Sequence, residues 1–360
     1  MMMRQSTIRF VLITALAAWL VFTGLAAAAA DAPFYQGKTM TIVEGRAPGG
    51  TGSFRTQAVA KYLVKYLPGS PAVVYQHMEG GGGTAAANNL VNTAKKDGLV
   101  IGNIGTGVYS NAIFGAPGVR YKLDDFIFLG SASTGGPYML LARPGLGTDT
   151  AETLRKQKGL RFANRSVGHT MYILDRMMAW TLELKEPKWI LGYNDQEIDL
   201  ALQRGEADIR STNLNSFLRD IPNAIADGFT VPLIMRNTKG RGAEFVPEFP
   251  RTKAAHLDQF LDTELKRQVL RLHDSSRPGS SVFMVAKGIP EPALKALKEA
   301  FDRVWKDPQF AEEYKKLSGE PTDPITGEEI HQVLDRMPKD PKVMEVYKQI
   351  IGAGPLPPVK

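Results

Sequence analysis

The stretch MTIVEGRAPGGTGSFRTQAVAKYLVKY, residues 40–66, decides the fold expected for this chain. Its first five residues are largely apolar and predict a short buried strand at 40–44. The glycine-rich turn 48–53 follows, and then apolar side chains recur every three to four residues from Phe54 to Tyr66, which predicts a helix. A strand, a glycine-rich turn and a helix in this order form the repeating unit of an α/β fold.

The same alternation of short apolar runs and helical periodicity continues along the chain. It predicts strands at 40–44, 72–77, 99–104, 126–131, 138–142, 160–163, 188–191, 207–210, 231–235 and 281–286. Beyond about residue 290 the pattern becomes helical, and helices are predicted at 292–306, 308–317, 327–337 and 341–350. We therefore expect α/β architecture followed by a helical C-terminal tail that wraps around a domain.

The N-terminus has the composition of a secretory signal peptide. Arg4 and Arg9 supply positive charge, residues 10–25 are apolar or small, and the alanines at 26–30 offer cleavage sites. The apolar core is shorter than the roughly 20 residues that a membrane-spanning helix needs. We expect residues 1–30 to be removed on export, leaving a protein free in a bacterial periplasm, without a lipid anchor because the chain has no Cys.

Composition argues against several classes of function. Loss of Arg4 and Arg9 lowers the formal net charge from +7 to +5, and no run of five like charges occurs, so neither nucleic-acid binding nor a polybasic membrane segment is indicated. The absence of Cys excludes thiol catalysis and Cys-ligated metals, and the five histidines lack metal-ligand spacing. There is no G-x-S-x-G or Walker motif, so we expect no enzyme activity, cofactor or metal.

Glycine, which makes up 35 of the 360 residues, concentrates where predicted strands lead into helices. The turn after the first strand contains Pro48, Gly49, Gly50, Thr51 and Ser53. Similar turns follow the next two strands, with Gly82, Gly83 and Thr84 in one and Thr106 in the other. Such turns let backbone NH groups approach a carboxylate or phosphate closely, although tight turns use glycine for geometry alone as well.

These features resemble those of the substrate-binding proteins of tripartite tricarboxylate transporters, the Bug or TctC-like family of periplasmic receptors. The resemblance lies in TIV at 41–43 before PGG at 48–50, LPGSP at 67–71, KDG at 96–98, VRY at 119–121, EIDLAL at 197–202, RGEAD at 204–208, GIP at 288–290 and KDPQF at 306–310. It covers essentially the whole mature chain, and it is carried by the order and spacing of these stretches.

The resemblance implies a two-lobed periplasmic binding protein of type II, each lobe a mixed sheet flanked by helices. It places lobe one at 31–142 and 237–360, lobe two at 143–236, and chain crossings near 138–143 and 231–238. Such a receptor closes around a small carboxylate like a flytrap and presents it to the integral membrane permease subunits of the transporter. A monomer is expected.

The resemblance also assigns the ligand contacts to turns of both lobes. In lobe one these are the turns at 48–53 and 80–84, and Thr106 in the third turn and Arg46 are further predicted ligand-binding residues. In lobe two the predicted ligand-binding residues are Asn164, Arg165, Ser166, His169, Arg210, Ser211 and Asn213.

Departures from the family pattern suggest which ligand is bound. Ser53 stands where many members have an Asp that could pair with an ammonium group, and Gln57 stands where many have Arg. Arg46 and Arg165 add guanidinium groups that favour a second carboxylate. We therefore expect a dicarboxylate or an aromatic carboxylate. The alternative is that Arg46 and Arg165 are exposed and Arg210 is structural.

Two other functions use the same scaffold. A periplasmic ligand sensor for a signalling system would differ only in its partner. A hydrolase or isomerase would need a nucleophile and a base, which these residues do not supply.

Overall fold

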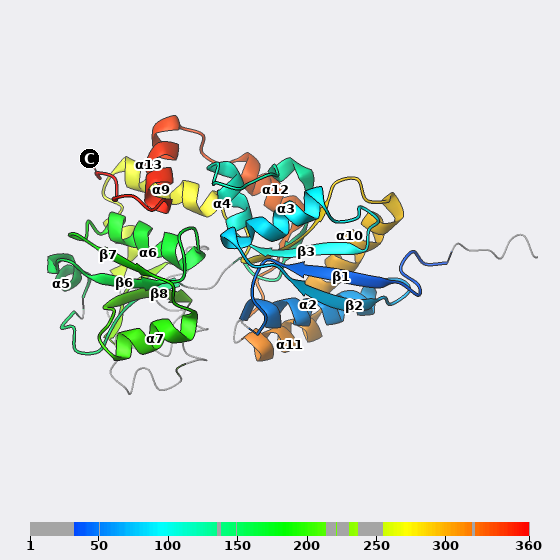
Figure 1. The fold of residues 1–360 in the computed structure, drawn as a ribbon, viewed down its shortest axis with the longest axis horizontal. Helices are drawn as coiled ribbons and strands as arrows, with labels where there is room; N and C mark the ends of the chain where they lie inside the picture. The colour runs from blue at the N-terminus through cyan, green and yellow to red at the C-terminus, as the bar shows by residue number, and fades with distance from the viewer. Residues whose placement is uncertain are drawn as a thin grey trace, which may run out of the picture.

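The computed structural model describes residues 32–49, 51–134, 138–148, 150–213, 221, 230–236, 255–318 and 321–359. These residues form two halves, each built on one six-stranded sheet (Figure 1). The predicted signal peptide at 1–30 lies outside the described residues.

The first sheet has the strand order β12-β4-β11-β3-β1-β2. β1 pairs in parallel with β2 and β3, whereas β11 runs antiparallel to β3 and β4, so the sheet is mixed. Its strands are β1 (Thr39–Glu44), β2 (Ala72–His77), β3 (Val100–Gly105), β4 (Phe126–Ser131), β11 (Ser281–Ala286) and β12 (Ile325–Thr326).

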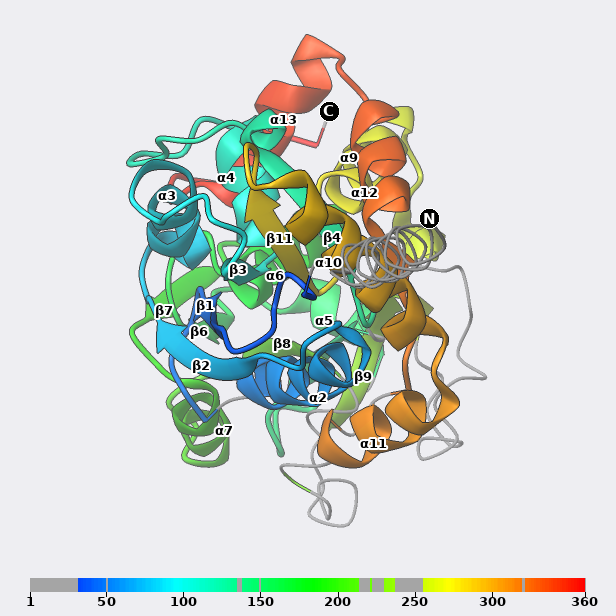
Figure 2. The ribbon, with the colours of Figure 1, turned by 90° about the vertical axis from the view of Figure 1, so that its right-hand side faces the viewer.

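Helices cover both faces of the first sheet, as Figure 2 shows. On one face, α2 (Thr51–Tyr66), α10 (Glu291–Lys306) and α11 (Pro308–Ser318) bury one apolar cluster. On the other face, α3 (Thr84–Asn92), α4 (Gly107–Ile113) and α12 (Gly327–Asp335) bury a second. Residues on opposite sides of the central strands enter opposite clusters, as Met40 and Val43 do in β1.

The second sheet has the strand order β10-β9-β5-β8-β6-β7. β6 is parallel to β7 and β8, and β5 is antiparallel to β8 and β9. Its strands are β5 (Tyr138–Ala142), β6 (Arg161–Asn164), β7 (Lys188–Leu191), β8 (Ile209–Asn213), β9 (Thr230–Arg236) and β10 (Ala255–His256). The ten predicted strands are all present, and only the two-residue strands β10 and β12 were not predicted.

The second sheet is also covered on both faces. α6 (Thr170–Thr181), α9 (Glu264–Ser275) and α13 (Pro341–Ile351) pack on one face, together with α5 (Ala151–Lys156). α7 (Asp195–Gln203) packs on the other. Along β5, Leu140 enters the first of these clusters and Leu141 the second, which is the period of two expected for a central strand.

The two sheets divide the chain differently from the boundaries expected from the sequence. β5 was assigned to lobe one but pairs with β8 and β9 in the second sheet. β9 lies inside that sheet, so the segment 231–236 is not a crossing between the halves, and residues 237 and 238 lie outside the described part. α9 packs on the second half and β11 belongs to the first sheet, so the chain crosses back to the first half at 276–280.

The helices of the C-terminal tail pack on both halves. The four predicted helices are present, but they do not wrap one domain: α10, α11 and α12 pack on the first sheet, whereas α13 packs against α6 and α9. A third crossing therefore lies at 336–340, between α12 and α13. Phe114, which follows α4 of the first half, stacks on Tyr347 of α13 with ring centroids 4.8 Å apart.

Candidate ligand-binding site

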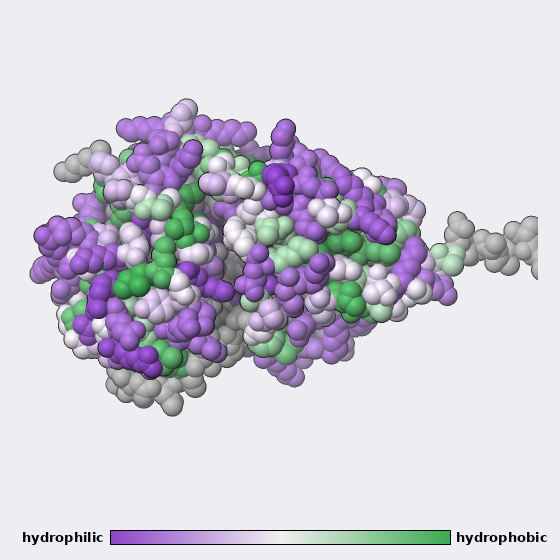
Figure 3. Space-filling model, in the orientation of Figure 1, coloured by the Kyte–Doolittle hydropathy of each residue, from purple (hydrophilic) through white to green (hydrophobic). Residues whose placement is uncertain are grey.

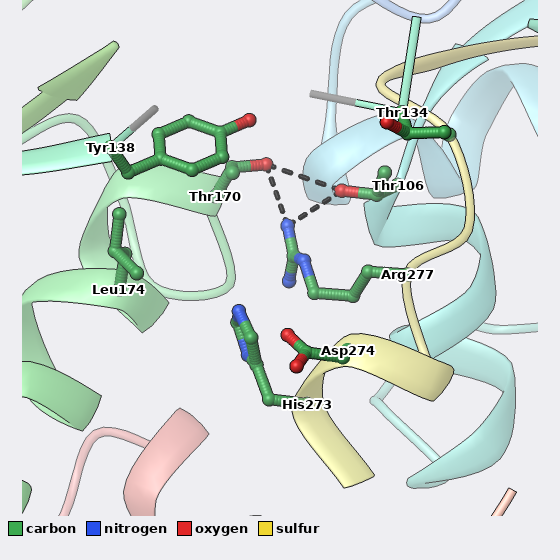
Figure 4. A pocket seen from close by; sticks show the side chains of 9 residues that line it. Thr106, Thr134, Tyr138, Thr170, Leu174, His273, Asp274 and Arg277 are labelled. Carbon is green, nitrogen blue, oxygen red and sulfur yellow. Dashed lines mark hydrogen bonds between the residues drawn. The ribbon is translucent and has the colours of Figure 1, made fainter. Parts of the chain in front are cut away.

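A small cavity lies where the two halves meet (Figure 4). Its volume is about 40 Å³, more than the roughly 10–15 Å³ that a cavity needs to hold one water molecule. On the face shown in Figure 3, a furrow separates the two halves. The cavity is lined by Thr106, Thr134, Tyr138, Thr170, Leu174, His273, Asp274, Arg277 and Gly279, which come from both halves and from the crossing between them.

Arg277 joins the two halves through hydrogen bonds. Its Nη2 donates to Oγ1 of Thr106 at 2.6 Å and to Oγ1 of Thr170 at 2.7 Å. Thr106 follows β3 of the first half, and Thr170 begins α6 of the second. The two hydroxyl oxygens are 3.4 Å apart. Arg277 Nη1 is buried and has no hydrogen-bond partner among the described residues.

The glycine-rich turn 80–83 borders the cavity region from the first half. Gly83 adopts φ +101°, and a Cβ there would lie 2.5 Å from Cγ2 of Ile104, so only glycine fits. A Cβ on Gly82 would lie 3.6 Å from the carbonyl oxygen of Gly168, in the loop before α6. One on Gly107 would lie 2.4 Å from the carbonyl oxygen of Gly82. The turn thus packs beside the Thr106–Gly107 peptide and approaches the second half.

Thr84 fixes the shape of this turn. Its hydroxyl donates to the carbonyl of Gly81 at 2.8 Å, and Nδ2 of Asn111 donates to both Thr84 Oγ1 (2.9 Å) and the Gly81 carbonyl (2.7 Å). Of the predicted site residues, the structure therefore brings Gly82, Gly83, Thr84 and Thr106 together.

The turn after β1 lies partly at the surface. Pro48 and Gly49 are exposed, whereas Ser53 is buried and donates to the carbonyl of Ala47 at 3.3 Å. Gly50 and the side chain of Thr51 lie outside the described residues. The serine hydroxyl therefore supports the loop that leads into α2.

Arg46 is held within the first half. Its Nη2 donates to the carbonyl of Asn103 at 3.2 Å, and a Cβ on Gly52 would lie 2.4 Å from its Nη1, so glycine at 52 leaves room for the guanidinium. Burial lowers the pKa of Arg46 to about 10, and the nearby carboxylate of Glu44 opposes that shift. Arg46 is not among the residues that line the cavity.

Arg210 is held within the second half. It is 5% exposed and forms an ion pair through Nη1 with Oδ1 of Asp199 on α7. Its Nη2 also donates to Oγ1 of Thr212 at 3.3 Å. Ser211 and Asn213 of the same strand are buried, and the Ser211 hydroxyl contacts the sulfur of Met178 at 3.7 Å. These contacts favour the structural alternative for Arg210.

Asn164 pairs with a second buried acid. Its Nδ2 donates to Oδ2 of Asp175 at 2.9 Å, and both residues are fully buried. Burial raises the pKa of Asp175 to about 7, against hydrogen bonds from Ser211 and Asn164 and the charge of Arg210. At neutral pH this carboxyl group therefore carries less than a full negative charge.

The loop from Arg165 to His169 leads into α6. The carbonyl of Arg165 accepts from the NH of Gly192 at 2.9 Å, and the carbonyl of the exposed Ser166 accepts from the NH of His169 at 3.2 Å. His169 caps the helix, because its Nδ1 accepts from the NH of Met171 at 3.3 Å. Gly168 of this loop lies close to Gly82 of the first half.

Sequence reasoning missed Arg277, the charged group that joins the halves. The polar segment SSRPGS at 275–280, which places Pro and Gly just before β11, was the available signal for a functional loop. The boundaries expected from the sequence place this segment within lobe one, away from the predicted crossings. His273 and Asp274, also in the cavity wall, precede the same segment.

Among the described residues, no group of three or more His, Asp or Glu side chains is arranged to hold a metal ion. In the same part of the chain, no helix combines the length and apolar character needed to cross a membrane.

The fold is that of two-lobed periplasmic binding proteins of type II, and its structural neighbours are TctC and Bug solute-binding proteins. The chain matches no known protein-family model and no curated protein sequence. The likeness to these neighbours is therefore structural. At the level of the fold, it confirms the resemblance inferred from the sequence.

Three solved structures illustrate the likeness, each with a TM-score of 0.61. A ligand-free TctC solute-binding protein from Polaromonas is 17% identical, with 88% of this chain and 99% of that chain covered. MatC from Rhodopseudomonas palustris with bound malate is 18% identical at the same coverages. Rpa4515 from R. palustris with adipate is 13% identical, with 87% and 96% covered.

Proposed function

We propose that this protein is a periplasmic receptor that binds a small dicarboxylate between its two halves and delivers it to a tripartite tricarboxylate-type membrane permease. The observation that carries the proposal is the cavity at the junction, where Arg277 lies between hydroxyl groups of both halves. Solved neighbours of the same fold hold malate and adipate, which are both dicarboxylates.

The surrounding chemistry suits binding better than catalysis. The glycine turn at 80–83 and the loop before α6 present backbone groups toward each other across the junction. Arg46, Pro48, Gly49 and Ser53 lie in or beside the turn after β1, where backbone NH groups of the loop remain candidates for a carboxylate. The proposal includes removal of residues 1–30 on export and closure of the halves around the ligand.

A thermal-shift screen followed by a turnover assay tests this function. Monocarboxylates, dicarboxylates, tricarboxylates and amino acids are added separately to the purified protein. A ligand present at 100 times its Kd stabilises a receptor by about 2.7 kcal/mol, so a dicarboxylate should raise Tm by several degrees. Stabilisation by a dicarboxylate that is recovered unchanged supports the receptor. Turnover of the ligand, or no stabilisation by any carboxylate, would contradict it.

A further inference from the structure

We propose that Arg277 binds one carboxylate group of the ligand inside the cavity, together with the hydroxyl groups of Thr106 and Thr170. This inference rests on the proposed function and deepens it by naming the residue that selects an anionic ligand. Arg277 lies outside the strand-to-helix turns from which the ligand contacts were predicted.

The first argument is the incomplete hydrogen bonding of the guanidinium. The two groups that accept from Nη2 are neutral hydroxyls, and Nη1 is buried without a hydrogen-bond partner among the described residues. A guanidinium keeps its charge at physiological pH and has five N–H donors to satisfy. A cation in a partly desolvated site is strongly favoured by an anion that accepts those donors.

The second argument is what the two threonines can still donate. Each hydroxyl has one proton and two lone pairs, and in this structure each accepts from Arg277. The two hydroxyl groups also share a hydrogen bond of 3.4 Å, so one proton lies between them and would have to turn away for both hydroxyls to donate to an anion. One threonine belongs to each half, so an anion held by both would tie the halves together.

The third argument is size and surroundings. The cavity, of about 40 Å³, has room for a small polar group such as a carboxylate, and Thr106 in its wall is followed by Gly107, which touches the glycine turn toward which the rest of the ligand would extend. His273 is occupied with Tyr347, at 2.8 Å between Nδ1 and the hydroxyl oxygen. Asp274 also lines the cavity, but Figure 4 shows no hydrogen bond from Arg277 to it.

Calorimetric titration of matched variants tests the assignment. The probe is whichever of succinate, malate or adipate binds the wild-type protein most tightly. Arg277→Gln removes the charge, and Arg277→Lys keeps it but loses the planar fork. Arg271→Gln is the control. It removes a cation near the end of α9, and the side chain of Arg271 is 65% exposed.

We expect Arg277→Gln to weaken probe binding by about 10- to 100-fold, Arg277→Lys to be intermediate, and Arg271→Gln to stay within about twofold of wild type. A crystal structure with the probe should place a carboxylate oxygen within hydrogen-bonding distance of the guanidinium. This second measurement decides the matter if Arg277→Gln fails to fold.

The outcomes separate the two proposals. If the wild type binds a dicarboxylate but Arg277→Gln binds it equally well or more tightly, the role of Arg277 is wrong and the receptor function stands. Tighter binding in that variant would mean that Arg277 only holds the halves together. If the wild type binds none of the three probes, the proposed dicarboxylate receptor itself is overturned.

Discussion

Two arginines, Arg277 at the junction and Arg210 inside the second half, differ in how their charge is balanced. Arg210 has a carboxylate partner, Asp199, and lies in the middle of a sheet. Arg277 has two hydroxyl partners, one from each half, and lies in a crossing segment. The ligand role proposed for Arg277 rests on this difference, because its hydrogen bonds with Thr106 and Thr170 go to neutral hydroxyls and not to a carboxylate.

The same contrast extends to the neighbouring carboxylates. Near β8, Asp208 is enclosed by Arg143 and Arg161, so this carboxylate is also paired within the protein. In the junction cavity, Arg277 forms no hydrogen bond with the one carboxylate that shares the lining, Asp274. Internal ion pairs should therefore govern the stability of the second half, and the junction should govern ligand binding.

The largest loss of stability is expected from breaking the ion pair between Arg210 and Asp199. Arg210→Met leaves the carboxylate of Asp199, whose side chain is 14% exposed, without its cation. Removing one partner of a buried ion pair typically costs about 3–5 kcal/mol, so the midpoint of urea unfolding should fall sharply. The affinity of the folded fraction for a dicarboxylate should change by less than about threefold.

The matched comparison is Arg277→Gln, which should lower the free energy of unfolding without ligand by less than Arg210→Met does, because its loss leaves neutral hydroxyls and not a buried carboxylate without a partner. Adding Asp199→Asn to Arg210→Met should recover part of the lost stability. Equal destabilisation by Arg210→Met and Arg277→Gln would remove the distinction between the two regions.

A loss of stability of intermediate size is expected when Asp208 is replaced. Burial alone would raise the pKa of this carboxyl group, but hydrogen bonds from Arg161 and Arg143 outweigh it and lower the pKa to about 2. A lowered pKa means that the unfolded chain binds the proton more readily, so this stability is present above about pH 4 and is lost as the pH falls toward 2.

Asp208→Asn should therefore cost up to about 2 kcal/mol at pH 7 and flatten the acid limb of the stability profile between about pH 4 and 2. Urea unfolding across that range measures both quantities. Asp302→Asn on α10, where the side chain is 61% exposed, is the control and should leave the profile nearly unchanged. An unaltered acid limb in Asp208→Asn would show that these arginines do not stabilise the ionised carboxylate.

Much of the fold could be predicted from the sequence, because it depends on local patterns. The alternation around residues 40–66 identified β1 and α2, and each apolar run predicted as a strand became one. The division into halves could not be read in the same way. It depends on pairing between distant strands, as when β5 joins β8 and β9 instead of the preceding sheet.

The site was predictable to a smaller extent. Glycine signals turns through its own backbone geometry, so Gly82, Gly83 and the neighbouring Thr106 could be chosen from the sequence. The sequence offers several arginines of equal appearance, and only three-dimensional contacts show that Arg210 meets Asp199 while Arg277 meets two threonines. The partner of a side chain, more than its type, decides whether its charge is available to a ligand.

The smallest effect is expected at Thr170, where only a hydroxyl group changes. Thr170→Val keeps the shape of the side chain but removes one hydrogen-bond donor from the proposed carboxylate site, so dicarboxylate affinity should fall about 3- to 10-fold, or about 1 kcal/mol. Thr181→Val at the other end of α6 is the control, since Thr181 is buried and lies outside the cavity wall. Calorimetric titration distinguishes two roles of the hydrogen bond between Thr170 and Arg277. Weaker binding in Thr170→Val means that the hydroxyl helps to hold the ligand, whereas tighter binding means that it competes with the ligand for the guanidinium of Arg277.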